Sequence, residues 1–342
     1  MTSLERVLTT LGHKEPDRVP VFLLLTMHGA KTLGLSIKEY FSNPGHVAEG
    51  QLQMLRKFGH DCVYTFYYAA IETEAWGGEV IYRDDGPPNA GAPLISNVSG
   101  IRSLVPPRVA ESRCLWKVLE TTRQVKTEVG NSVPIIGVVM SPFSLPVMQL
   151  GFENYLEVIY NHPDLFNDLM AKNEVFCIEW ANAQLQAGAT AICYFDPVSS
   201  PSIIPSDLYH STGFSVASRT LAQIKGPTAT HFASGRCLPS VELLAKTGTA
   251  VLGVSALEDL GEVKRVLNGR LSILGNLNGL GMVDWTIAQT REKVREAIAK
   301  AAPGGGFILS DNHGEIPYQV KDETLMAIVE SVKDFGTYPI VH

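Results

Sequence analysis

Eight short apolar segments, rich in β-branched residues, recur along the chain with room for helices between most of them. Most are uninterrupted apolar runs rather than alternating ones, which is typical of parallel strands buried on both faces. We expect strands at 19–26, 61–67, 133–140, 190–195, 228–233, 250–254, 271–274 and 306–310.

From the third expected strand onward, segments with helical spacing of apolar positions separate the strands. We expect helices at 163–187, 206–224, 239–247, 257–267, 287–301 and 320–334. Eight strands alternating with helices fit one α/β domain, a (β/α)₈ TIM barrel over residues 1–342, better than a doubly wound sheet. A capped helix at the N-terminus precedes the barrel as an extension. The Gly- and Pro-rich segment 77–107 interrupts the alternation of strands and helices, and we expect a hairpin or lid inserted there, after strand two.

Composition narrows the class of protein. Apolar residues make up 45% of the chain and charged residues 18%, which allows a large core and favours a surface partly covered by a partner or a homodimer. The net charge is −7 without any Lys/Arg run, so we expect no nucleic-acid partner. Five scattered cysteines, no signal peptide and no membrane-length apolar run predict a reduced, cytoplasmic protein.

In such a barrel, the loops that follow the strands meet at one rim, and chemistry is expected there. Histidines, carboxylates and other polar side chains follow most of the strands. The candidates are His28, Tyr67, Tyr68, Glu72, Glu74, Asp196, Ser200, His231, Asn276, Asp311 and His313.

A single histidine after a strand is more often a packed residue than a ligand, but three at one rim strengthen the case for a site. Two neutral imidazoles and a carboxylate would form an open zinc site. Glu72 and Glu74 alternate, so on an extended segment they share a face and could be substrate acids; a solvated hairpin explains them nearly as well. Asp196 ends an apolar strand, where an unpartnered carboxylate is costly, and this slightly favours a functional role.

Four segments resemble the uroporphyrinogen decarboxylase superfamily. "ERVLTTLGHKEPDRVPV" (5–21) is similar to its N-terminal entry. "SPFSLPVMQLGFENYLEVIYNHPDLFNDLM" (141–170) and "QLQAGATAICYFDPVSSPSIIPSDLY" (184–209) look more like its branch of corrinoid-protein methyltransferases. "APGGGFILSDNHGEIPYQVKDETLMAIVESV" (302–332) completes a resemblance that covers nearly the whole chain.

The resemblance implies a (β/α)₈ barrel and, in thiol-methylating members, zinc held by a His-x-Cys pair after strand five and a cysteine after strand eight. Here His231 matches the first ligand, but the other two positions fall on Ala233 and His313, so the thiolates are missing. The decarboxylases place arginines just after strand one. The corresponding segment here, "LLTMHGAKTLG", contains none, which argues against decarboxylation.

The resemblance therefore implies a methyltransferase that moves a methyl group from a small methylated substrate to the cobalt of a separate corrinoid protein. We expect an O-methyl ether such as a methoxylated aromatic, because histidine ligands in place of cysteines suit an oxygen substrate. In this interpretation His231 and His313, with Asp311, Glu74 or Asp196, hold zinc or supply the proton.

The remaining candidates, His28, Tyr67, Tyr68, Glu72, Ser200 and Asn276, would contact the substrate. An aromatic cluster of Tyr64, Phe66, Tyr67, Tyr68 and Trp76 could line its pocket, although such a cluster is as often core. Two alternatives stay open: transfer from a methylcorrinoid protein to a thiol, and a non-catalytic protein that binds a corrinoid or tetrapyrrole.

Overall fold

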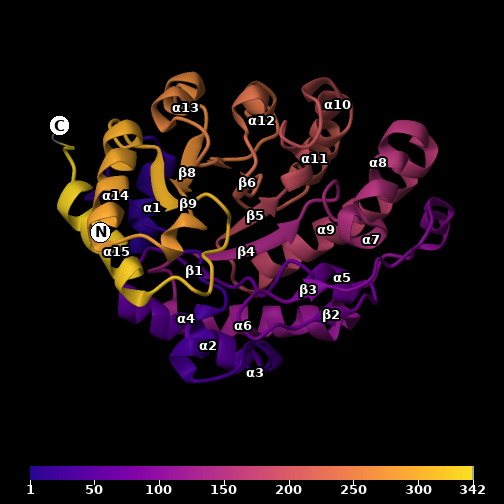
Figure 1. Cartoon of the computed structure of the whole chain (residues 1–342), viewed down its shortest axis with the longest axis horizontal. Coiled ribbons are helices and arrows are strands. Elements are labelled where there is room, and N and C mark those ends of the chain that lie inside the picture. Colours follow the sequence, from indigo (N-terminus) through magenta and orange to yellow (C-terminus); the bar gives the residue numbers. More distant parts are fainter. Residues whose placement is uncertain (341–342) are drawn as a thin grey trace.

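The computed structural model describes residues 1–340 and forms a curled parallel sheet surrounded by helices (Figure 1). Seven strands lie side by side in chain order, and every neighbouring pair is parallel. They are β1 (Val63–Tyr64), β4 (Ile135–Met140), β5 (Ala191–Phe195), β6 (Thr228–His231), β7 (Val251–Gly253), β8 (Ser272–Leu277) and β9 (Phe307–Asp311). The expected α/β barrel class is confirmed, and seven of the eight expected strands are present.

The eighth expected strand, 19–26, is an extended segment that makes only one regular bridge, between Val21 and Leu309 of β9. The Leu309 N–H donates to the carbonyl of Pro20 at 2.9 Å. On the other side, the Asp61 N–H donates to the Val21 carbonyl at 2.8 Å. This closing segment, residues 19–26, thus lies between β9 and β1 and joins the two edges of the sheet. Because Pro20 has no N–H to donate, its ladder stays incomplete.

The expected helices appear outside the sheet. Helices α9 (Pro163–Ala187) and α14 (Ile287–Ala301) have the predicted bounds, whereas the helix expected at 206–224 is interrupted at Thr212. The other helices after β4 are α7 (Pro146–Leu150), α8 (Phe152–Asn161), α10 (Ser206–Ser211), α11 (Gly213–Leu221), α12 (Val241–Leu244), α13 (Leu260–Leu267) and α15 (Asp322–Phe335). Before β4 lie α1 (Ser3–Leu11), α2 (His28–Leu33), α3 (Ile37–Ser42), α4 (Pro44–Phe58), α5 (Ile71–Ala75) and α6 (Arg113–Val129).

The segment 77–107 contains a short antiparallel hairpin of β2 (Val80–Ile81) and β3 (Asn89–Ala90). Its role as a lid remains a prediction. Within residues 1–340, no helix combines the length and the apolar character needed to cross a membrane.

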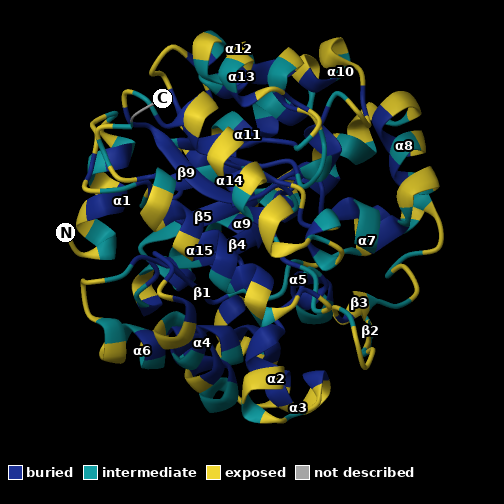
Figure 2. Ribbon diagram, turned by 60° about the vertical axis from the view of Figure 1, so that its left-hand side comes forward, coloured by how far each residue is buried: buried dark blue, intermediate teal, exposed yellow. Residues whose placement is uncertain are grey.

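Apolar side chains fill the inside of the barrel, so it is a core rather than a channel. The strands at its centre are coloured as buried in Figure 2. Val138, Cys193, Val251, Leu274 and Ile308, from β4, β5, β7, β8 and β9, belong to one buried cluster there. A second layer of apolar residues packs the helices against the outside of the sheet. A binding or catalytic site is therefore expected at one of the two ends of the barrel, where the strands begin or end.

At the start of the strands, a buried carboxylate holds the closing segment in place. Asp61 has no exposed surface and accepts hydrogen bonds from Arg6 Nη1 and Arg18 Nη1, each at 2.7 Å. It also accepts the backbone N–H of Val21 at 2.9 Å and the hydroxyl of Ser3 at 2.8 Å. One carboxylate thus links α1, the closing segment and the start of β1.

We expect Asp61→Asn to lower the free energy of unfolding by about 3–5 kcal/mol, because Arg18 would lose its compensating charge and Arg6 would keep only its pair with the exposed Asp17. Urea denaturation followed by circular dichroism measures this loss. Asp334→Asn serves as a control, since its pair with Arg291 is exposed on both sides and should contribute less than about 1 kcal/mol. Equal losses in the two variants would show that the Asp61 network does not hold the barrel closed.

Candidate functional site

The rim at the ends of the strands gathers two histidines and two carboxylates around the end of β6 and the loop after β9. His231 ends β6 and is fully buried, with its ring stacked on Phe195 at a centroid distance of 5.6 Å. Gly253 on the neighbouring strand leaves room for this ring, because a Cβ there would lie 2.2 Å from His231 Cδ2. Gly314 covers the ring, since a Cβ there would lie 3.5 Å from His231 Cε1.

His231 is neutral and its hydrogen-bond pattern defines its tautomer. Its Nδ1 accepts the backbone N–H of Ala233 at 3.0 Å, so the ring proton sits on Nε2. Burial, and then the proximity of His313, lower the pKa of His231 to about 3. The Nε2–H group finds no hydrogen-bond partner among residues 1–340.

His313 lies at the same rim, and a hydrogen bond joins its loop to the one that follows His231. His313 Nδ1 and the Ser234 hydroxyl are 2.8 Å apart. His313 keeps some exposed surface, whereas His231 has none. The structure therefore brings the two predicted metal ligands to one end of the barrel, with only one of them open to solvent.

Asp311 organises the loop after β9. Its Oδ2 accepts the backbone N–H groups of His313 and Gly314, each at 2.8 Å. Its Oδ1 makes no hydrogen bond within the described chain. Burial raises the pKa of this carboxyl, although the two backbone donors oppose the shift.

Glu315, a residue that the sequence analysis missed, is the second carboxyl at the rim. One of its oxygens accepts the hydroxyl of Thr26 from the end of the closing segment. Burial raises the pKa of Glu315 to about 7, and the charge of Asp311 adds to the shift. Its position in the same loop as Asp311 and His313 was the only sequence signal that could have found it.

The donor set at this rim does not fit a zinc ion. The Nδ1 lone pair of His231 is used by a backbone N–H and Nε2 carries the proton, whereas a metal ligand must present a free lone pair. His313 Nδ1 is engaged with Ser234, and position 233 is an alanine. Within residues 1–340, no three His, Cys, Asp or Glu side chains are placed to hold a metal ion.

Two further candidates, Asp196 and Ser200, fix neighbouring loops. Asp196 Oδ1 accepts the hydroxyls of Ser141 at 2.5 Å and Ser144 at 2.7 Å, so it holds the loop after β4. Burial raises the pKa of Asp196. The Ser200 hydroxyl donates to the carbonyl of Arg236, in the loop that follows His231.

The four candidates after β1 lie outside the barrel. Glu72 and Glu74 sit on helix α5, so the expected shared face of an extended segment is wrong. Glu72 accepts the backbone N–H of Met140 at 3.1 Å, and burial raises its pKa to about 7. Glu74 accepts the hydroxyl of Tyr68 at 2.6 Å, and the Tyr67 hydroxyl bonds to α6. These side chains belong to the layer between the sheet and its helices.

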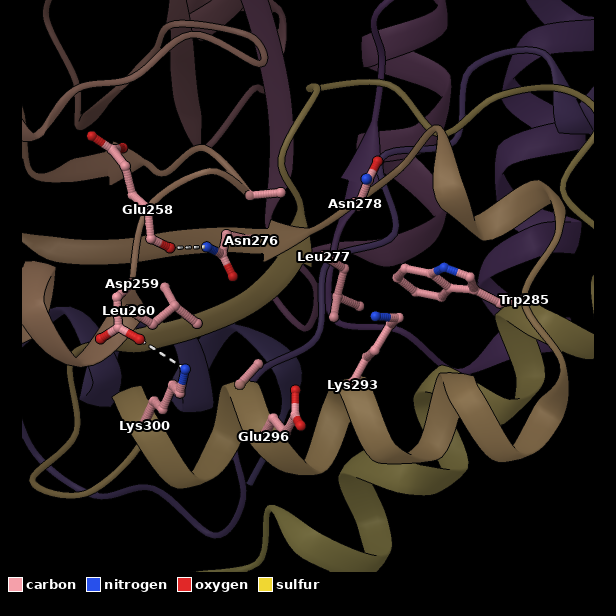
Figure 3. A pocket seen from close by; sticks show the side chains of 12 residues that line it. Glu258, Asp259, Leu260, Asn276, Leu277, Asn278, Trp285, Lys293, Glu296 and Lys300 are labelled. Atoms are coloured by element: carbon pink, nitrogen blue, oxygen red, sulfur yellow. Dashed lines mark hydrogen bonds and ion pairs between the residues drawn. The ribbon is translucent and has the colours of Figure 1, made fainter.

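The last two candidates, His28 and Asn276, have partners other than the histidine pair. His28 begins α2 and lies edge-on to Tyr318 at 6.1 Å, and burial lowers its pKa to about 3. The amide nitrogen of Asn276 donates to the carbonyls of Ser255 and Glu258 at 2.9 and 3.0 Å. Asn276 lines a separate pocket between α13 and α14 (Figure 3).

Comparison with known proteins agrees with this architecture. The family described as Uroporphyrinogen decarboxylase (URO-D) matches residues 2–335. A methylcobamide:CoM methyltransferase, MtaA, from Methanosarcina barkeri is 26% identical over 314 residues, which cover 88% of this chain and 91% of that protein. A uroporphyrinogen decarboxylase from Xylella fastidiosa is also 26% identical, over 97% of this chain and 99% of that protein.

Among solved structures, a methyltransferase from Methanosarcina mazei superposes with a TM-score of 0.87 at 22% identity. The superposition covers 98% of this chain and 99% of that one. This similarity confirms the fold along the whole length of the chain.

We expect Gly253→Ala to lower the free energy of unfolding by about 1–3 kcal/mol, because the added methyl group overlaps the His231 ring. In a His231→Ala background the same substitution should cost much less, since the ring is gone. Urea denaturation of the parent protein, the two single variants and the double variant measures the coupling free energy between the two positions. Additive losses would mean that Gly253 does not create the space for His231.

We expect no stoichiometric zinc on the purified protein after equilibrium dialysis against micromolar zinc, as measured by elemental analysis. His231→Ala and His313→Ala should retain as little zinc as the parent protein, because Nε2 of His313 is the one imidazole nitrogen of this pair that can offer a free lone pair, and a single ligand does not hold zinc. One zinc ion per chain that disappears in both variants would contradict this description of the rim.

Proposed function

The chain belongs to the uroporphyrinogen decarboxylase (URO-D) family, and we propose that within it this protein is a methyltransferase working with a separate corrinoid protein. It would take the methyl group from a small O-methyl ether, such as a methoxylated aromatic. The similarity to MtaA over 88% of the chain supports the methyltransferase branch. The observation that carries the choice of an ether is the carboxyl of Glu315, which can hold a proton near neutral pH at the rim.

The residues after the closing segment support methyl transfer over decarboxylation of a polycarboxylate. The only cation in "TMHGAKTLG" is Lys31, and its ammonium donates to the Tyr318 carbonyl and lies 4.0 Å from the centre of the Tyr318 ring. Arg6 and Arg18 are held by Asp61 at the opposite end of the barrel. This part of the rim therefore offers no free cation to clamp the carboxylates of a porphyrinogen.

The chemical difficulty of ether demethylation is the leaving group. The corrinoid supplies the nucleophile that accepts the methyl group, and the ether oxygen departs well only if it receives a proton. Glu315 is half-protonated near pH 7, so it can donate that proton at the pH of a cell. Asp311 holds the backbone of the same loop through two N–H groups and so fixes the direction of Glu315.

The same rim is less suited to methylating a thiol. A thiol acceptor must be deprotonated, and the thiolate ligands that hold zinc in the thiol-methylating relatives are absent here. The protonatable carboxyl of Glu315 and the neutral imidazole of His231 instead suit the release of an oxygen leaving group. We therefore place the protein on the methyl-donating side of the corrinoid.

A direct test is methyl transfer from methoxylated aromatics to cob(I)alamin, followed by the absorbance of methylcobalamin. We expect methylcobalamin to form with an ether donor and not with the corresponding phenol. If the protein instead demethylates methylcobalamin only when a thiol is present, the direction is reversed. If neither reaction occurs, the protein is a binder rather than a methyltransferase.

We expect Glu315→Gln to lower kcat of this reaction by about 10²- to 10⁴-fold, because the amide cannot donate the proton. In the parent protein the rate should fall as pH rises through about 7, where Glu315 loses its proton. The residual rate of the variant should lack this step. Glu330→Gln, an exposed change on α15, is the control and should leave the pH profile unchanged. A parent profile without a step near pH 7 would exclude Glu315 as the acid.

A further inference from the structure

A pocket with a volume of about 210 Å³ lies outside the barrel, between α13 and α14 (Figure 3). The loop after β7 and the end of β8 form its inner wall, and one side of α14 forms its floor. His231, Asp311, His313 and Glu315 do not line it, so it is separate from the candidate site. Five charged side chains border this pocket, and they differ in whether the fold already uses them.

Three of the five charges are satisfied within the fold. The carboxylate of Glu258 accepts the backbone N–H groups of Cys237 at 2.9 Å and Leu238 at 2.6 Å. Asp259 pairs with Lys300 at 2.7 Å and closes one end of the pocket. These groups shape the walls and leave no charge for a ligand.

The other two charges, Lys293 and Glu296, are unused. They lie three residues apart on α14, a spacing at which opposite charges commonly pair. Neither makes an ion pair with any residue from 1 to 340, and both rise from α14 toward the pocket (Figure 3). The Lys293 ammonium lies 5.2 Å from the centre of the Trp285 ring instead. The pocket therefore presents one free cation and one free anion.

The side-chain amide of Asn276 adds a hydrogen-bond acceptor whose orientation is fixed. Its amide nitrogen is used by the Ser255 and Glu258 carbonyls, which fixes the orientation of the side chain. Its amide oxygen has no partner in the described part of the chain and is turned toward the pocket (Figure 3). Leu260 and Leu277 supply apolar surface between these polar groups.

We propose that this pocket binds a small zwitterion, a molecule with an ammonium and a carboxylate joined by a short apolar stem, such as an amino acid. Its carboxylate pairs with Lys293, and its ammonium is accepted by Glu296 and the amide oxygen of Asn276. Leu260 and Leu277 contact the stem. Lys293 and Glu296 are both exposed and unpaired within residues 1–340, so a ligand with two opposite charges gains two charged contacts, whereas a ligand with a single charge gains one.

The test is isothermal titration calorimetry on the full-length protein with three probes of similar size. β-Alanine carries both charges, propionate only the negative one and propylamine only the positive one. We expect β-alanine to bind at least about tenfold more tightly than either, because each charged contact contributes on the order of 1.4 kcal/mol or more.

Lys293→Met and Glu296→Gln should each weaken β-alanine binding about tenfold, by removal of one charged contact. Glu292→Gln is the matched control, because Glu292 lies on the same helix, pairs with Arg295 and does not line the pocket. Circular dichroism melts of all three variants check that α14 remains folded.

Three results would overturn the proposal: no heat of binding with β-alanine at tens of millimolar, equal binding of propionate or propylamine, or unchanged β-alanine binding in both variants. None of these measurements uses methyl transfer. A failure here is therefore distinguishable from a failure of the proposed function.

Discussion

The closure of the barrel by one buried carboxylate is the constraint on which the rest of the structure depends. The segment 19–26 is too irregular to pair along its whole length, yet it must join β9 to β1. Asp61 fixes it by accepting the Val21 N–H while two arginines balance the carboxylate charge. Once the ring is closed, Thr26 at the far end of the same segment reaches Glu315, so one end of the barrel positions the other.

Burial then favours the uncharged forms of His231 and Glu315 at the rim. The fully enclosed ring of His231 stays neutral, and Glu315 keeps its proton to about pH 7. Both effects have the same cause, which is that a charged group loses its hydration in a low-dielectric environment. Glycines at 253 and 314 allow this enclosure, since a side chain at 253 would overlap the His231 ring and one at 314 would overlap the ring of Phe195, which stacks on it.

Within the family, a shared barrel hosts both decarboxylases and methyltransferases, so the fold alone does not select the reaction. Three features of this chain support the proposed reaction. Arg6 and Arg18 are bound to Asp61 at the base of the barrel, position 233 is an alanine, and the carboxyl of Glu315 can hold a proton near neutral pH. The proposal of proton donation to an ether oxygen rests on these features.

The sequence by itself determined the strand order, the bounds of α9 and α14 and the family, because these follow from local periodicity and from ordered motifs along the chain. It also selected His231, Asp311 and His313 as neighbours, since parallel strands end at one rim. Only the tertiary structure decided that Glu72 and Glu74 lie on helix α5 and bond to Met140 and Tyr68, and that Glu315 joins the loop of Asp311 and His313 at the rim. The direction of a side chain, its burial and its proton depend on partners from distant parts of the chain, and these are fixed only when the barrel closes.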